Sequence, residues 1–206
     1  IAAREAALGL DQPFYIQYFM WVGELLKGNL GVSIKNYQPV AEMIGSRLGP
    51  TLLLMGASLI VSLILSVPAG IYSAVHQYTK RDYAVVTASF FGSSIPGFFL
   101  ALVLVYIFTV RLGLLPSTGM ETLGGSGGAL DVAAHMVMPV LVLSVSMAGS
   151  NIRYIRSAVL EILGQDYLRT ARAKGIGRRR VIWRHALANA LVPIVTVIGM
   201  QIPLLF

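Results

Sequence analysis

The residues whose type and spacing most clearly suggest a binding function are the basic side chains between positions 153 and 185, RYIRSAVLEILGQDYLRTARAKGIGRRRVIWRH. Nine Lys or Arg residues stand there against only two acids, Glu161 and Asp166. Such a run can bind nucleic acid, or it can hold a loop on the cytoplasmic side of a membrane. The long apolar segments that flank it favour the membrane explanation over nucleic-acid binding.

The sequence contains no motif for metal binding, nucleotide binding or catalysis. The chain has no cysteine, which excludes disulfides and thiolate metal ligands. It has no Gly-Lys dipeptide, so the GGSGG stretch at 124–128 is a flexible connector and not a phosphate loop. No Ser/His/Asp set or metal-ligand cluster falls in the apolar segments, and His135 is expected to be a satisfied interfacial histidine. We therefore expect no catalytic residue, metal or resident cofactor in this chain.

Four long windows without charge dominate the sequence. Hydrophobic residues make up 56% of the 206 residues, charged residues only 12%, and the mean hydropathy is +0.73. A helix needs about 20 apolar residues to cross a bilayer. The windows that qualify are 51–75, 83–110, 132–152 and 186–206. The pattern predicts an all-α, polytopic membrane protein with four spans, with the transmembrane body over 51–206 and an external interfacial segment over 1–50.

The charges between the windows predict the orientation. Segments 76–82 and 153–185 carry net charges of +1 and +7, whereas 1–50 and 111–131 carry 0 and −1. Loops rich in Lys and Arg stay in the cytoplasm, so the first two segments are expected inside and the other two outside. An outer segment without a signal predicts a further span before Ile1, and hence more than four spans in the full chain.

Two non-spanning segments have helical patterns. Residues 13–27 place aromatic and aliphatic side chains on one face. That face favours a helix on the bilayer surface, with docking of an external partner as the alternative. Residues 166–174 form a second helix that Gly175 should end, and another helix starts near Arg178. This predicts a rigid cytoplasmic knob.

The stretch DYLRTARAKGIGRRRVIWRHALANALVP at 166–193 resembles the cytoplasmic "EAA" loop of permeases from ABC importers. RSAVLEILGQDYLRTARAKG, LGLLPSTG, LGLDQP and GNLGVSI are similar to the dipeptide, oligopeptide and nickel branch of that family. The resemblance covers nearly the whole chain. Arg169 departs from the wider superfamily, which has Glu at this position, but it fits the peptide and nickel branch.

The resemblance implies a six-span permease subunit that lacks its own nucleotide site. ATP and Mg would be bound by separate ATPase subunits, and a loop helix would carry their motion to the membrane. The implied partners are those ATPase subunits, a second similar permease and an external substrate-binding protein, in a bacterial-type inner membrane. The residues implied to contact the ATPase subunit are Asp166, Arg169, Thr170, Ala171, Ala173, Lys174 and Gly175.

Other functions remain open from the residues alone. A secondary transporter or channel would need charged or polar residues along the spans and paired broken helices. A structural or assembly protein would tolerate free substitution of the cytoplasmic loop. The cargo is also left open between dipeptides, longer peptides, nickel and glutathione-like solutes.

Overall fold

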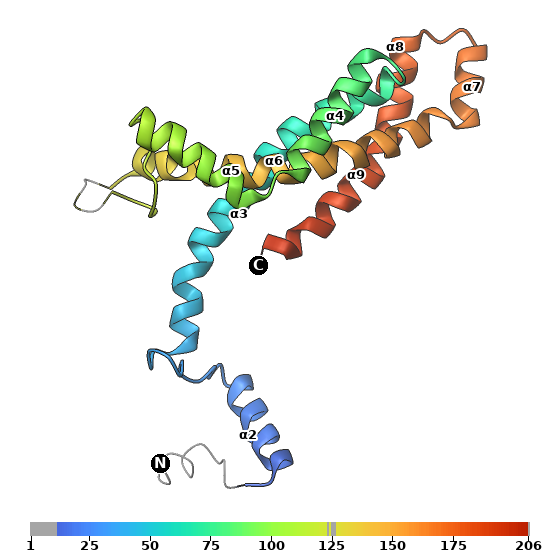
Figure 1. Ribbon diagram of the computed structural model, residues 1–206. Coiled ribbons are helices and arrows are strands. Elements are labelled where there is room, and N and C mark those ends of the chain that lie inside the picture. The colour runs from blue at the N-terminus through green and yellow to red at the C-terminus, as the bar shows by residue number, and fades with distance from the viewer. Residues whose placement is uncertain (1–11, 123, 125–126, 206) are drawn as a thin grey trace. The chain divides into compact units, whose positions relative to one another are not determined.

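The computed structural model describes residues 12–122, 124 and 127–205, so most of the LGLDQP motif and part of the GGSGG connector fall outside it. The chain divides into two compact units, 1–50 and 51–206, and the boundary falls within one helix. The described part consists of helices and the turns and loops that connect them, with one isolated bridge between Val32 and Pro39. The elements, as labelled in Figure 1, are α2 (Phe14–Leu26), α3 (Val40–Val75), α4 (Lys80–Ser94), α5 (Gly97–Leu104), the π-helix η1 (Val105–Arg111), α6 (Ala129–Leu163), α7 (Asp166–Ala173), α8 (Arg178–Arg180), the π-helix η2 (Val181–Ala186), α9 (Leu187–Gln201) and the 3-10 turn η3 (Ile202–Leu205).

Among the described residues, three helices are long and apolar enough to cross a membrane: α3, α6 and the continuous run Arg178–Gln201. A fourth crossing exists if α4 and α5–η1 are taken together, although they meet at a bend of 92°. The all-α, polytopic architecture expected from the sequence is thus confirmed. The second predicted window, however, is not one straight helix.

The bend has a local cause. Pro96 has no amide hydrogen to donate back into α4, and it restricts the residue before it to extended conformations. Ile95 adopts such a conformation, with φ −71° and ψ 122°, and α5 begins directly afterwards at Gly97. The proline therefore ends one helix and starts the next.

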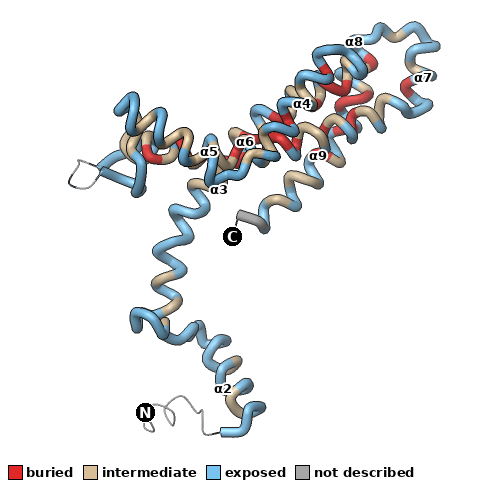
Figure 2. The backbone as a smooth tube through the Cα atoms, viewed as in Figure 1, coloured by how far each residue is buried: buried red, intermediate tan, exposed pale blue. Residues whose placement is uncertain are grey.

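The core of the second unit lies where α3, α6 and α9 meet. Its buried members are Ala74, Ile155, Val159, Leu187, Ala190 and Ile194. Figure 2 shows the buried residues concentrated along this shared stretch. Phe98 and Phe99 of α5 are largely exposed, as expected for side chains that face lipid.

Small residues let these helices approach closely. A Cβ at Gly70 of α3 would lie 2.8 Å from Cγ2 of Ile155 on α6. A Cβ at Gly149 of α6 would lie 2.5 Å from the backbone oxygen of Ser89 on α4. Glycine at such crossings is typical of helix packing in membranes, where close van der Waals contact replaces the hydrophobic effect.

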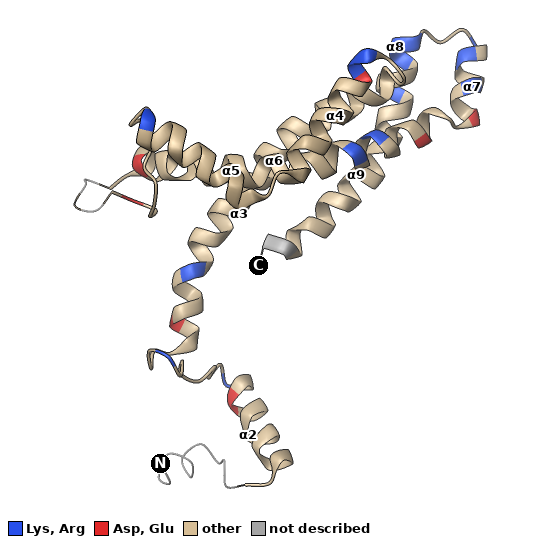
Figure 3. Ribbon diagram, in the orientation of Figure 1, with Lys and Arg blue, Asp and Glu red and all other residues tan. Residues whose placement is uncertain are grey.

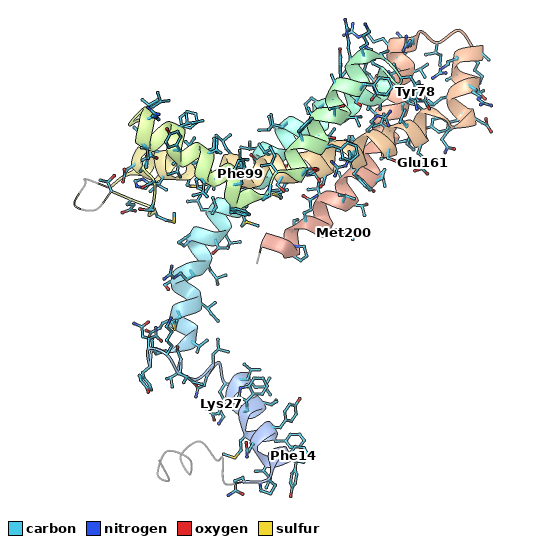
Figure 4. The ribbon with its side chains drawn as sticks, viewed as in Figure 1. Phe14, Lys27, Tyr78, Phe99, Glu161 and Met200 are labelled. Carbon is cyan, nitrogen blue, oxygen red and sulfur yellow. The ribbon has the colours of Figure 1, made fainter. Side chains whose placement is uncertain are left out.

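In the first unit, α2 confirms the predicted helix and its end at Gly28, which has a φ of +82°. Phe14 and Lys27 mark the two ends in Figure 4. Its aromatic side chains are exposed, Trp21 among them. The amine of Lys27 donates to the Glu24 carboxylate over 2.7 Å, and this hydrogen bond lowers the pKa of Glu24 below its usual value.

Candidate functional site

The segment after α6 forms the helix–glycine–helix unit that the sequence predicts. α6 continues through Arg153 and Arg156 to Leu163, so the predicted loop 153–185 starts with three turns of helix. α7 then runs from Asp166 to Ala173. Gly175 has a φ of +80°, and its amide donates to the Arg172 oxygen over 2.9 Å. This left-handed residue ends α7 in the way that glycine usually ends helices.

A small hydrophobic core, separate from the main one, holds α7 in place. Leu168 of α7 is fully buried against Val181 and Ala186 of η2. The side-chain amide of Asn189 on α9 also donates to the Tyr167 hydroxyl over 2.9 Å. These contacts join α7 to the start of the last span. α7 is therefore held against the membrane helices and does not hang free on a loop.

The predicted contact residues differ in their surroundings. Asp166, Arg169, Thr170, Ala173, Lys174 and Gly175 are exposed. Ala171 is half-buried and packs against the small core around Leu168. Asp166 and Arg169 form a surface ion pair of 3.4 Å, which contributes little to stability. The exposed residues can meet another molecule without rearrangement, whereas a large side chain at Ala171 would first disturb the loop itself.

A cavity of about 530 Å³ lies beside this knob. The turn between α3 and α4 contributes His76 and Gln77, and the end of α6 contributes Leu163. Arg172 and Arg178 complete the wall from the loop side. The two segments expected on the cytoplasmic side, 76–82 and 153–185, are thus brought together around one opening. Figure 3 shows Lys and Arg gathered at this end of the second unit.

A buried ion pair joins the same two segments, and sequence reasoning missed it. Asp82, in the first turn of α4, is 1% exposed. Its oxygens accept from Nε and Nη2 of Arg156 over 2.8 Å each. The Ser73 hydroxyl and the Tyr78 amide, at 2.9 Å, donate to the same carboxylate (Tyr78 is labelled in Figure 4). Because Asp82 accepts from four donors, it anchors the α3–α4 turn to α6.

Only a faint signal for this pair is present in the sequence. Asp82 follows two basic residues, so its position indicates a loop charge, and Arg156 falls within the basic segment 153–185. The uncharged window 83–110 predicts a span without acidic residues. This needs correction, because the broken span begins at Lys80 and Asp82 is buried in the first turn of α4. The signal that could have found the pair is helical continuity: with α6 extended to Leu163, Arg156 becomes a spanning-helix arginine that requires a partner.

A second set of polar side chains forms hydrogen bonds between α3, α6 and α9. The Asn151 amide on α6 donates to the Ser62 hydroxyl on α3 over 3.2 Å. Gln201 of α9 donates in turn to the Asn151 oxygen over 2.7 Å. Arg153 lies 4.7 Å from the Phe90 ring centroid and donates to the Ser93 hydroxyl of α4. Hydrogen bonds of this kind hold helices together in membranes.

His135 has a hydrogen-bond partner within its own helix, whereas its place at the membrane edge stays a prediction. It lies in the second turn of α6 and is 7% exposed. Its Nδ1 is 2.8 Å from the Asp131 backbone oxygen. The ring is therefore satisfied locally. In the described part of the chain no group of three His, Cys, Asp or Glu residues is placed to hold a metal ion.

These features define a polytopic helical membrane protein with an anchored, basic knob at one end. Residues 66–206 match the family described as "Binding-protein-dependent transport system inner membrane component", and the chain belongs to that family. It is accordingly a multi-pass component of the bacterial inner membrane.

The chain is also similar to individual permease proteins whose names mention peptides or glutathione. The chain is 43% identical over 196 residues to the oligopeptide transport system permease protein AppB of Bacillus subtilis, covering 95% of this chain and 62% of that protein. It is 44% identical over 203 residues to a putative peptide permease protein of Brucella ovis, covering 98% and 64%. The glutathione transport system permease protein GsiC of Escherichia coli K12 is 37% identical over 194 residues, covering 94% and 60%. The chain therefore spans less than two thirds of the length of these relatives.

Proposed function

We propose that this chain forms part of the permease subunit of an ATP-driven importer, and that α7 is the helix through which ATPase subunits act on the membrane bundle. The observation that carries the proposal is the contrast between the two sides of α7. Leu168 is buried among η2 residues, whereas Arg169, Ala173 and Lys174 are exposed. A helix fixed on one side and open on the other can transmit a push from a partner into α6 and α9.

Two features of the chain also favour an ATP-driven importer over a transporter driven by an ion gradient. The sequence has no Gly-Lys phosphate loop, so ATP and Mg would be held by separate ATPase subunits. Asp82 is already saturated by Arg156, Ser73 and Tyr78, so it is poorly suited to carry protons or sodium. The competing function, a secondary transporter or channel, would need a free ionisable group along the path.

The cargo proposed is peptides. The names of the relatives mention oligopeptides, peptides and glutathione, which is itself a small peptide. Nickel and related small solutes are the other cargo of the branch that the sequence resembles. A binding protein would deliver the cargo to an outer face that includes 1–50 and 111–131, and a second permease subunit would complete the path. Segments 76–82 and 153–185 would then face the cytoplasm.

The test replaces Ala173 by Trp in the full-length subunit, co-expressed with its partners. Ala173→Ser is the matched control, because it keeps a small side chain at the same exposed position. We expect Ala173→Trp to reach normal membrane abundance but to lose most peptide uptake and most co-purification of the ATPase subunits. Gly175→Val adds backbone strain at a φ of +80° and should have the same effect. Normal uptake by both Ala173→Trp and Gly175→Val would overturn the role of α7.

A second experiment separates the energy sources. Inverted and right-side-out vesicles that contain the complete transporter are supplied with either ATP or a proton gradient. We expect uptake to require ATP on the side of residues 153–185 and to survive collapse of the gradient. Uptake driven by the gradient without ATP would favour the secondary transporter instead.

A further inference from the structure

Four arginines and one tryptophan line a shallow, open concavity at the start of the last span. Its volume is about 770 Å³, and it is lined by Gly177, Arg178, Arg179, Arg180, Trp183 and Arg184. The lining contains no acidic residue. Within the described part of the chain, the side chains of these arginines form no ion pair or hydrogen bond. Four unneutralised guanidinium groups around one opening are suited to an anion.

Helix length places this concavity at the membrane surface. The span Arg178–Gln201 has 24 residues, which corresponds to about 36 Å of helix. The hydrocarbon core is only about 30 Å thick, so roughly one turn lies outside it. All of the charged residues are at the Arg178 end, so that end is the one in the headgroup region. Arg184 lies deepest and can extend its side chain back toward the surface.

The orientation of η2 supports the same location. Val181 and Ala186 are fully buried against Leu168. Trp183, between them in sequence, is 65% exposed. Exposed tryptophan is enriched at the level of the lipid headgroups. The helix therefore presents its apolar side to the protein, and its arginines and indole to the surroundings.

We propose that this concavity binds the phosphate group of an anionic phospholipid headgroup. A topological signal alone requires positive charge, but it does not require four arginines around one opening. A lipid here would hold the start of α9 at a fixed depth beside α7. The proposal rests on membership of the inner-membrane family and on this geometry. It does not depend on the cargo or on the role of α7 in coupling.

The experiment titrates the purified full-length permease, in mild detergent, with a fluorescent phosphatidylglycerol. The variant is Arg180→Gln/Arg184→Gln. The matched control is Arg169→Gln/Lys174→Gln, which removes the same charge from the same segment outside the concavity. A basic residue near the surface contributes about fivefold to the binding of anionic lipid, so the variant should bind roughly 25-fold more weakly. The control should stay within about twofold. Arg180→Lys/Arg184→Lys, which keeps the charge, should retain most of the binding and shows that the fold is intact.

Competitors identify the ligand. Unlabelled short-chain phosphatidylglycerol should displace the probe, whereas phosphatidylcholine and millimolar inorganic phosphate should not. Equal displacement by inorganic phosphate would assign the site to a free anion and overturn the lipid proposal. Displacement of the probe by purified ATPase subunits would assign the arginines to a protein contact and would also overturn it. If Arg180→Gln/Arg184→Gln binds the probe as tightly as the wild type, the arginines do not form a lipid site and the proposal is overturned.

Discussion

Replacing Asp82 by Asn tests whether the buried ion pair holds the α3–α4 turn on α6. The substitution keeps the shape of the side chain but removes the negative charge. It leaves the Arg156 guanidinium, whose side chain is only 23% exposed, without a counterion. Breaking a buried pair costs about 3–5 kcal/mol. Because Arg156 keeps some access to water, and Asn can still accept one hydrogen bond, we expect a loss near the lower limit, about 3 kcal/mol.

The measurement is the melting temperature of the full-length permease in mild detergent, followed as the soluble fraction of a fluorescent-protein fusion after heating. A loss of 3 kcal/mol corresponds to a decrease of roughly 6–12 °C for a protein of 150–250 residues, and to a somewhat smaller decrease for a longer subunit. Asp166→Asn is the control. It breaks an ion pair of the same chemistry whose side chains are 92% and 77% exposed, and it should change the melting temperature by about 2 °C or less.

A double variant gives the decisive comparison. Asp82→Leu/Arg156→Met removes both charges and fills the space with apolar atoms, so most of the stability should return. An Asp82→Asn variant with the melting temperature of the wild type would refute the role of the ion pair. A double variant no more stable than Asp82→Asn would refute it equally, because the loss would then not come from an orphaned charge.

Three further outcomes are expected. Gly149→Ala should destabilise the full-length protein by roughly 1–3 kcal/mol because its Cβ would lie 2.5 Å from a carbonyl oxygen of α4; Gly199→Ala, with no atom within 4 Å, should be neutral or slightly stabilising in the same thermal assay. Asn151→Leu should cost about 1 kcal/mol in a denaturant titration, since both of its hydrogen-bond partners lose their contact; an unchanged midpoint would mean that those partners find other bonds. Cysteines placed at Ser117 and Gly177, both exposed, should differ in intact cells: a membrane-impermeant thiol reagent should label position 117 only, and labelling at 177 without lysis would reverse the proposed orientation.

The sequence predicts the elements of this fold better than their junctions. Long uncharged windows identify α3, α6 and α9, because a helix is the structure that satisfies its own backbone in lipid. Gly175 marks the end of α7 because few other residues adopt a positive φ. The window 83–110 shows that hydropathy alone does not predict where a span is broken. Its composition predicts one span, and the turn at Ile95 and Pro96 divides it.

Tertiary partners are harder to predict than helices. Asp82 and Arg156 are 74 residues apart, and only the packing of α4 along α6 brings them together. Ala171 shows the same limit within the candidate site. The pattern indicates a small contact residue, but it does not distinguish contact with a partner from contact with Leu168 of the same loop.

The spacing of that ion pair also has a consequence for biosynthesis. A ribosome adds about 5–20 residues per second, so Asp82 is made roughly 4–15 s before Arg156. During this interval α3 and α4 can enter the bilayer, but the carboxylate has no guanidinium to meet. Until α6 arrives, the carboxylate has only Ser73, Tyr78 and water as donors at the cytoplasmic edge, so the contact with Arg156 completes the packing of the hairpin. A nascent chain arrested between these two residues should be an unusually good substrate for membrane chaperones and proteases.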